Sequence, residues 1–178
     1  IQRKIGNTDV PGKAIILYNK YSTRAKQSAA AIRRLTNNHP YFASAVVIGT
    51  SVAFQETMQR MREHMKDGEV NVIVPFGGDT TFNQAAMAVE GTKHILCATR
   101  GGNATNASMN LQQRNGRILS PQEVIEHGSI KEIRPVEMIV DGHRRIAVTI
   151  ADIGILSTGA AFLNGPMRML PGYRVAPI

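Results

Sequence analysis

The residues best suited to chemistry form a glycine turn, Gly77-Gly78-Asp79, which follows an apolar run and precedes a helical pattern. Paired glycines let the backbone approach a phosphate closely, and the following helix offers N–H groups and the positive end of its dipole. Asp79 stands where a carboxylate can cap that helix or hold Mg²⁺ near the phosphates. Side chains that can add further hydrogen bonds follow at Thr80, Thr81 and Asn83.

A second glycine turn, Gly101-Gly102-Asn103, follows the next apolar run. In an open parallel sheet, ligands bind beyond the carboxyl ends of the strands, which is where both turns are expected. Neither turn has the glycine-lysine pattern of a P-loop or the three-glycine pattern of a dinucleotide site. A tight loop in which Asp79 caps the helix is the structural alternative, and on these residues alone both interpretations stay open.

The elements that must position these turns alternate between strand and helix. Apolar runs predict strands over 13–18, 43–48, 70–74 (running into Pro75-Phe76) and 94–98. Apolar residues at helical spacing predict amphipathic helices over 24–38 and 54–65. A third helix is predicted to carry one apolar face formed by Phe82, Ala85, Ala86 and Val89. This alternation indicates an α/β fold with a parallel sheet and right-handed crossovers.

The pattern changes after about residue 128. Residues 130–140 and 144–150 are predicted strands joined by Asp141-Gly142, a favoured hairpin turn. We therefore divide the chain into an α/β nucleotide-binding domain over 1–128 and, over 129–178, the first strands of an incomplete antiparallel β domain with a C-terminal loop. A hairpin and a loop do not make a stable domain, so we expect that the natural protein is longer or that another sheet completes these strands.

Charge is spread unevenly along the 178 residues, whose net charge is +8. Residues 1–34 carry eight Lys/Arg and a single acid, Asp9. Such a segment suits nucleic acid, anionic lipid headgroups or nucleotide phosphates, while a solvated helix face explains it equally well. Nucleic acid ranks last among these partners, because only Tyr18 and Tyr21 are interleaved with the basic residues.

The cellular compartment is indicated by the single cysteine and by the absence of long apolar runs. One cysteine, Cys97, excludes an intramolecular disulfide and agrees with a reducing cytoplasm. Its apolar neighbours predict that it is a small buried core residue. The sequence contains no run of about 18 apolar residues and no secretory signal. We therefore expect a cytoplasmic protein.

In their order along the chain, these motifs resemble the catalytic domain of the diacylglycerol kinases, a family that includes sphingosine kinases and shares its fold with NAD kinases. The family's Gly-Gly-Asp-Gly-Thr signature, with an Asn two residues later, is matched by Gly77-Gly78-Asp79-Thr80-Thr81-Phe82-Asn83. Its Asn-Pro-x-Ser-Gly loop is matched by Asn19-Lys20-Tyr21-Ser22-Thr23, and its Thr after the second strand by Thr50. Its Gly-Thr-x-Asn-Asp turn is matched by Arg100-Gly101-Gly102-Asn103-Ala104. The likeness covers about residues 13–156.

The resemblance also has departures. Thr80 replaces a glycine, and if that position requires a positive φ, a β-branched residue there is strained by about 1–2 kcal/mol. Lys20 and Thr23 replace the proline and glycine of the first loop, Gly101 lacks the hydroxyl of the expected Thr, and Ala104 removes a carboxylate. The family's distal base and acidic metal ligands have no counterpart in the 178 residues.

The resemblance implies that the chain transfers the γ-phosphoryl group of ATP to a lipid hydroxyl, such as that of diacylglycerol, while bound peripherally at a membrane surface. It implies ATP and Mg²⁺ as cofactors, with Asp79 as both catalytic residue and metal ligand. The implied nucleotide-binding residues are Asn19, Lys20, Tyr21, Ser22, Thr23, Thr50, Gly77, Gly78, Asp79, Thr80, Thr81, Phe82, Asn83, Gly101, Gly102 and Asn103.

Two alternative functions stay open. A catalytically impaired nucleotide-binding regulator is favoured by Thr80 and Ala104, which depart from the family pattern. A kinase for a soluble substrate, such as NAD or a sugar, would use the same fold. The sequence leaves homo-oligomerisation open as well.

Overall fold

The computed structural model describes residues 4–5, 8–9, 12–65, 69–97, 113–114, 117–128, 130, 132–140 and 142–147. Its centre is a four-stranded parallel sheet in the order β4-β3-β5-β6. The strands are β3 (Ala14–Tyr18), β4 (Val46–Gly49), β5 (Val72–Phe76) and β6 (Ile95–Leu96). Their parallel pairing confirms the predicted α/β fold class.

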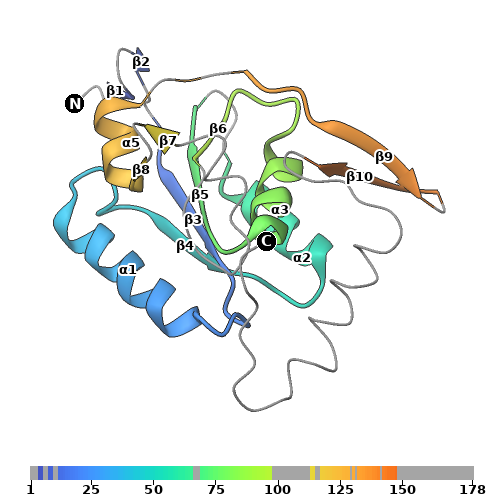
Figure 1. The fold of residues 1–178 in the computed structure, drawn as a ribbon, viewed down its shortest axis with the longest axis horizontal. Coiled ribbons are helices and arrows are strands. Elements are labelled where there is room, and N and C mark those ends of the chain that lie inside the picture. The colour runs from blue at the N-terminus through green and yellow to red at the C-terminus, as the bar shows by residue number, and fades with distance from the viewer. Residues whose placement is uncertain are drawn as a thin grey trace.

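Helices cover both faces of this sheet (Figure 1). They are α1 (Ala25–Asn38), α2 (Phe54–Glu63), α3 (Asp79–Val89) and α5 (Pro121–His127). Side chains from α1 and α5 pack on the sheet face that presents Ile16 and Val74. Those from α2 and α3 pack on the face that presents Ile15 and Ile73. Because the two central strands are covered on both sides, they consist of consecutive apolar residues rather than alternating ones.

The central strand β5 contains a proline, whose missing N–H would point away from β3. Pro75 pairs with Leu17 of β3. Three residues before Pro75, the N–H of Val72 donates to the Lys13 carbonyl and therefore points toward β3. In a parallel ladder, every second N–H points to the same neighbour, so the missing N–H of Pro75 faces the β6 side. Within the described residues, the register between β5 and β6 joins Val72 to Ile95 and Ile73 to Leu96, and it does not include Pro75.

The element boundaries differ from the predicted ones mainly at the starts of strands and of α3. Residues 43–44 form a turn, and β4 begins only at Val46. Helix α3 begins at Asp79, so that Asp79, Thr80 and Thr81 belong to its first turn and not to the preceding loop. The predicted apolar face of this helix is confirmed, since Phe82, Ala85 and Ala86 are buried.

The remaining strands form short antiparallel pairs. The pairs are β1 (Lys4–Ile5) with β2 (Thr8–Asp9), β7 (Gln113–Arg114) with β8 (Arg117–Ile118), and β9 (Val136–Val140) with β10 (His143–Ala147). The predicted hairpin around Asp141-Gly142 is confirmed, and Gly142 has the positive φ of 74° that favours glycine. Residues 148–178 lie outside the described residues, so the start of a β domain stays a prediction.

Two further predictions are tested by the described residues. Cys97 is 2% exposed and belongs to the core beside Val74, as predicted. None of the helices in the described ranges has the length and apolar composition needed to cross a bilayer.

Candidate functional site

The strand order creates a switch point between β3 and β5. From β3 the chain passes through α1 to β4 on one side, and the next strand, β5, lies on the other side of β3. The loops that leave β3 and β5 therefore diverge to opposite faces of the sheet. In open α/β sheets, ligands bind in the crevice at the carboxyl ends of the strands where this reversal occurs. Two of the sequence-predicted segments, 19–23 and 77–83, begin at this point.

Asn19 joins the three neighbouring strand ends at the switch point. Its backbone N–H donates to the Phe76 carbonyl at the end of β5, with an N···O distance of 3.1 Å. Its side-chain Oδ1 accepts from the Tyr21 N–H at 2.9 Å and from the Thr50 hydroxyl at 3.5 Å. Three predicted residues from two loops, Asn19 and Tyr21 after β3 and Thr50 after β4, are thus brought together. Thr50 is 4% exposed, so its position favours holding Asn19 over contacting a ligand directly.

The loop after β3 places a cation beside the end of β4. The exposed Lys20 lies with its Nζ 5.1 Å from the centre of the Tyr21 ring. Its Cδ is 3.4 Å from the point where a Cβ on Gly49 would stand. Ser22 closes the loop, because its hydroxyl accepts from the Arg24 N–H and its carbonyl accepts from the Ala25 N–H. The loop is therefore held by its own polar groups and keeps a positive charge at the sheet end.

Arg60 also reaches the end of β4 and was not predicted from the sequence. Its Nη1 donates to the Gly49 carbonyl at 3.3 Å from helix α2. β4 is the edge strand of the sheet, so this guanidinium caps an edge carbonyl. The position of Arg60 among other polar residues of an amphipathic helix gives no signal of this contact.

Gly77 is required by the close approach of Thr81. A Cβ at residue 77 would stand 2.2 Å from the Thr81 Oγ1 and 2.5 Å from its Cβ. The space that a side chain would need at the first glycine is therefore filled by the first turn of α3. Thr81 and Phe82 are 2% and 4% exposed, so their side chains face the interior. Any contact that these two residues make with a phosphate would come from their backbone.

The interpretation of Asp79 as the helix N-cap is wrong. The N-cap of α3 is Gly78, in extended conformation with φ −83° and ψ −169°, and Asp79 is the first helical residue. Glycine has no side chain with which to accept from the first-turn N–H groups, which in any α-helix lack partners within the helix. An anion placed there would meet both these N–H groups and the positive end of the dipole.

Thr80 does not have the backbone strain that a positive φ would cause. Thr80 lies in the first turn of α3, where the backbone is right-handed, and no positive φ is needed. The replacement of the family's glycine therefore leaves the helix start intact. Asn83 lies one turn further along, half-buried. The second predicted turn, with Gly101, Gly102 and Asn103, lies outside the described residues.

Asp79 is a carboxylate at the start of α3. Among the residues that the structure describes, no group of three or more His, Cys, Asp or Glu side chains is placed to hold a metal ion. A single carboxylate at a phosphate site suits Mg²⁺, which keeps several waters and is bound through one or two carboxylates together with substrate phosphates. In the described residues, Asp79 therefore does not belong to a metal site enclosed by the protein.

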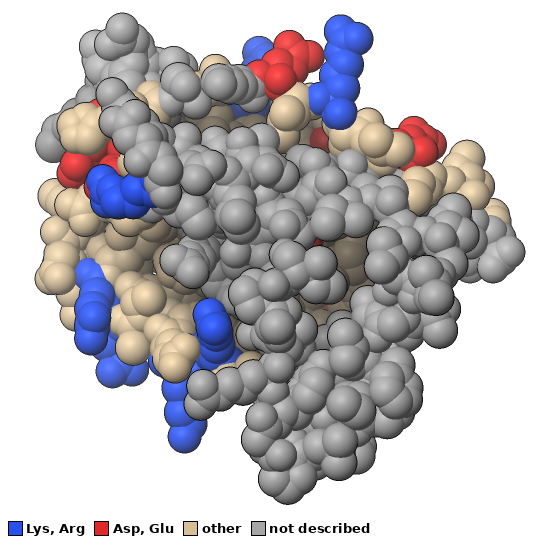
Figure 2. Space-filling view, viewed as in Figure 1, with Lys and Arg blue, Asp and Glu red and all other residues tan. Residues whose placement is uncertain are grey.

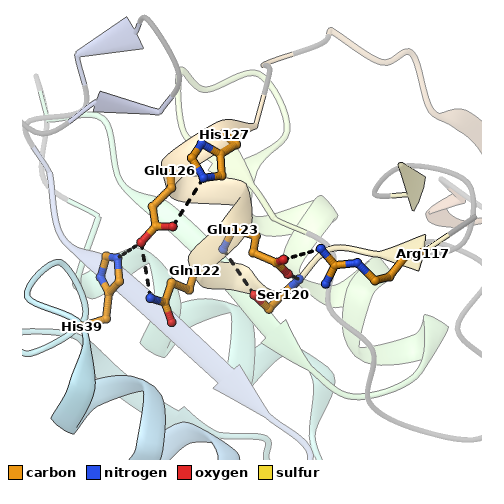
Figure 3. Close-up of polar contacts among 7 residues, drawn as sticks. All are labelled: His39, Arg117, Ser120, Gln122, Glu123, Glu126 and His127. Atoms are coloured by element: carbon orange, nitrogen blue, oxygen red, sulfur yellow. Dashed lines mark hydrogen bonds and ion pairs between the residues drawn. The ribbon is translucent and has the colours of Figure 1, made fainter. Parts of the chain in front are cut away.

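A second polar cluster surrounds α5 at the opposite end of the sheet (Figure 3). Glu126 contacts His39, Gln122 and His127. His39 Nδ1 accepts from the Tyr41 N–H at 3.2 Å, so in neutral His39 the proton is on Nε2, which faces Glu126 at 3.5 Å. These side chains bind one another, and the contact between Glu126 and His39 connects α5 to the end of α1.

The start of α5 is closed by its own residues. Ser120 and Glu123 form a reciprocal capping box, and Arg117 contacts the Glu123 carboxylate. Hydrogen bonding from the Ser120 backbone, with further bonds from Arg117 and the Ser120 hydroxyl, lowers the pKa of Glu123 to about 2. This cluster is a structural clamp, because each carboxylate is already bound by groups of the same chain.

The amino ends of the strands are joined by Asn71, which is 1% exposed. Its Oδ1 accepts from the Lys13 N–H at 3.0 Å, and its backbone N–H donates to His94 Nδ1 at 3.1 Å. Burial lowers the pKa of His94, which favours the neutral ring that this bond requires. No local sequence pattern indicates this network, because its members are 58 and 23 residues apart.

A scan against protein-family models and searches of curated proteins and solved structures found no match to this chain.

Proposed function

We propose that this chain is the nucleotide-binding part of an ATP-dependent lipid kinase similar to the diacylglycerol kinases. The observation that carries the proposal is the uncapped start of α3 at the switch point of the sheet, where Gly78 replaces the usual side-chain cap. The ordered likeness of residues 19–23, 50 and 77–83 to the family motifs supports the same function.

In this proposal the nucleotide phosphates lie against the first turn of α3. Its N–H groups and dipole would hold the anionic oxygens, and the positive charge of Lys20 would neutralise part of their charge. Asn19, fixed by the Phe76 carbonyl and the Thr50 hydroxyl, would border the same crevice. Phosphoryl transfer depends mainly on positioning and charge neutralisation, which are the contributions that these residues can make.

Asp79 would hold Mg²⁺, which supplies charge neutralisation at the phosphates. The carboxylate lies at the start of α3, next to the N–H groups proposed to bind the phosphates. The base that deprotonates the acceptor hydroxyl is expected from the β domain that the family carries, because the 178 residues contain no counterpart of it. The acceptor is a lipid by family resemblance.

The first test is calorimetric titration of the full chain with Mg²⁺-ATP. We expect saturable heat, and its absence would end the proposal. Transfer of labelled γ-phosphate is then measured with diacylglycerol and NAD side by side. We expect label on diacylglycerol, whereas label on NAD would indicate a soluble-substrate kinase. Binding without transfer to either would indicate a nucleotide-binding regulator.

Asp79→Asn tests the catalytic role of the carboxylate. It should lower transfer by about a hundredfold or more while preserving the fold. Glu126→Gln is the matched control, because Glu126 lies in the α5 cluster at the other end of the sheet. It should leave transfer unchanged. Equal rates in Asp79→Asn and the unmodified chain would remove Asp79 from the mechanism.

A further inference from the structure

The first third of the chain presents a face that carries only positive charge. Between Asp9 and Glu56 the sequence contains no acid, while it contains six bases. All six are exposed: Lys13, Lys20, Arg24, Lys26, Arg33 and Arg34. Figure 2 shows Lys and Arg side chains gathered over the α1 side of the molecule, with no Asp or Glu among them. A surface of this kind attracts an extended anionic partner.

Two of the most exposed apolar side chains of the sheet region stand beside these bases. Val52 is 85% exposed, and Tyr21 is 54% exposed. Val52 lies in the loop that leaves β4, and Tyr21 lies in the loop that leaves β3, next to Lys20. Exposure of a large aliphatic side chain to this degree is unfavourable in water, and it is explained if an apolar environment receives it.

The loops that carry these side chains lie side by side at the carboxyl end of the sheet. The Thr50 hydroxyl donates to Asn19 Oδ1 at 3.5 Å, and the chain of Lys20 passes Gly49. Both loops leave the same end of the sheet in Figure 1. We call residues 19–24 and 50–53, with Lys26 in the first turn of α1, the basic rim.

We propose that the basic rim docks on the surface of an anionic bilayer. Arg24 and Lys26 would face the headgroups, while Tyr21 and Val52 enter the boundary between headgroups and acyl chains. The proposal rests on the proposed function in one respect, since docking here would bring a lipid hydroxyl to the strand ends where the nucleotide is placed. Nucleic acid is disfavoured because Val52 offers nothing to a phosphodiester chain and the rim has one exposed aromatic.

The test is co-sedimentation of the full chain with vesicles, without nucleotide. We expect binding to vesicles of phosphatidylcholine mixed with phosphatidylglycerol, several-fold weaker binding to pure phosphatidylcholine, and weakening as salt rises. Equal binding to both vesicle types, or no binding to either, would overturn the proposal. A mobility shift of a single-stranded oligonucleotide at moderate salt, with no vesicle binding, would assign the face to nucleic acid instead.

Variants locate the contact. Val52→Ser should weaken vesicle binding several-fold, whereas Ile139→Ser, at an apolar side chain 70% exposed in strand β9, should not. Lys26→Gln should weaken vesicle binding more than Arg34→Gln. Arg34 lies eight residues, or about 12 Å, further along α1 than Lys26. Equal losses in the two charge variants, or none from Val52→Ser, would overturn the rim as the contact.

Calorimetry with Mg²⁺-ATP separates this proposal from the proposed function. Val52→Ser should bind ATP like the unmodified chain, because Val52 is outside the implied nucleotide site. Vesicle binding without ATP binding would leave the basic rim standing and end the kinase proposal. ATP binding without vesicle binding would leave the kinase proposal standing and would end the proposal that the basic rim docks on a bilayer.

Discussion

Helices α5 and α3, which begin near opposite ends of the parallel sheet, differ in how their first turns are capped. At the amino end, Asn71 bonds Lys13 and His94, and α5 closes its own first turn with Ser120 and Glu123. At the carboxyl end, α3 begins behind a glycine that has no side chain to cap it.

Under the proposed function, the amino end contributes stability and the carboxyl end receives the ligand. A polar group bonded within the chain contributes to folding and has little left to offer a partner. A helix start without a side-chain cap is weaker as a fold element but can bind an anion. Substitutions at the amino end should therefore change the free energy of unfolding, and those at the carboxyl end should also change nucleotide affinity.

The largest effect is expected from Gly77→Ala at the carboxyl end. The new Cβ would stand 2.2 Å from the Thr81 Oγ1, so α3 must shift. We expect a loss of about 3 kcal/mol in the free energy of unfolding, measured by urea titration, together with loss of ATP binding. Gly91→Asn is the control, because Gly91 has open space and a φ of 70° that Asn tolerates. It should cost about 1 kcal/mol or less.

Asn71→Ala should give the next largest effect. It should lower the free energy of unfolding without changing the ATP affinity. The Lys13 N–H would lose its acceptor in a partly buried setting, which costs about 1–3 kcal/mol. Urea unfolding measures the loss, and calorimetry on the folded variant should give an unchanged ATP affinity. A weakened affinity at unchanged stability would contradict the division between the two ends.

Ser120→Ala removes one half of the capping box on α5 and should cost about 1 kcal/mol. The melting temperature should fall, while the heat of ATP binding stays the same. Gln122→Ala, on the same helix but outside the capping box, is the control and should have a smaller effect. Equal losses in both variants would mean that the capping box does not set the stability of α5.

The smallest effect is expected from titration of His94. Burial lowers its pKa below 6.5 in the folded protein, so the unfolded chain takes up a proton first as the pH falls. The stabilisation is fully present above pH 6.5 and is lost as the pH falls toward the lowered pKa of the folded state. Urea midpoints measured from pH 8 to pH 5 should decline less in His94→Gln than in the unmodified chain. Parallel curves would remove His94 as a source of the pH dependence.

Much of the fold could be predicted from the sequence because its signals are local. The apolar run that forms β5 and the spacing of Phe82, Ala85 and Ala86 each lie within a few residues. Boundaries were less predictable: Ala43 and Ser44 precede the apolar run that forms β4, but they form a turn. Asp79 was a reasonable N-cap by residue type, yet Gly78 takes that position because Thr81 packs against Gly77.

The sequence by itself determined the alternation of strands and helices, the glycine turn and the one-sided charge of its first third. Only the tertiary structure decided that β3 lies between β4 and β5, which places Asn19 against Phe76 and beside Thr50. Strand order is set by packing between segments far apart in the chain, and a linear pattern carries no record of that packing. For the same reason, Arg60 at Gly49 and His94 at Asn71 became visible only in the folded chain.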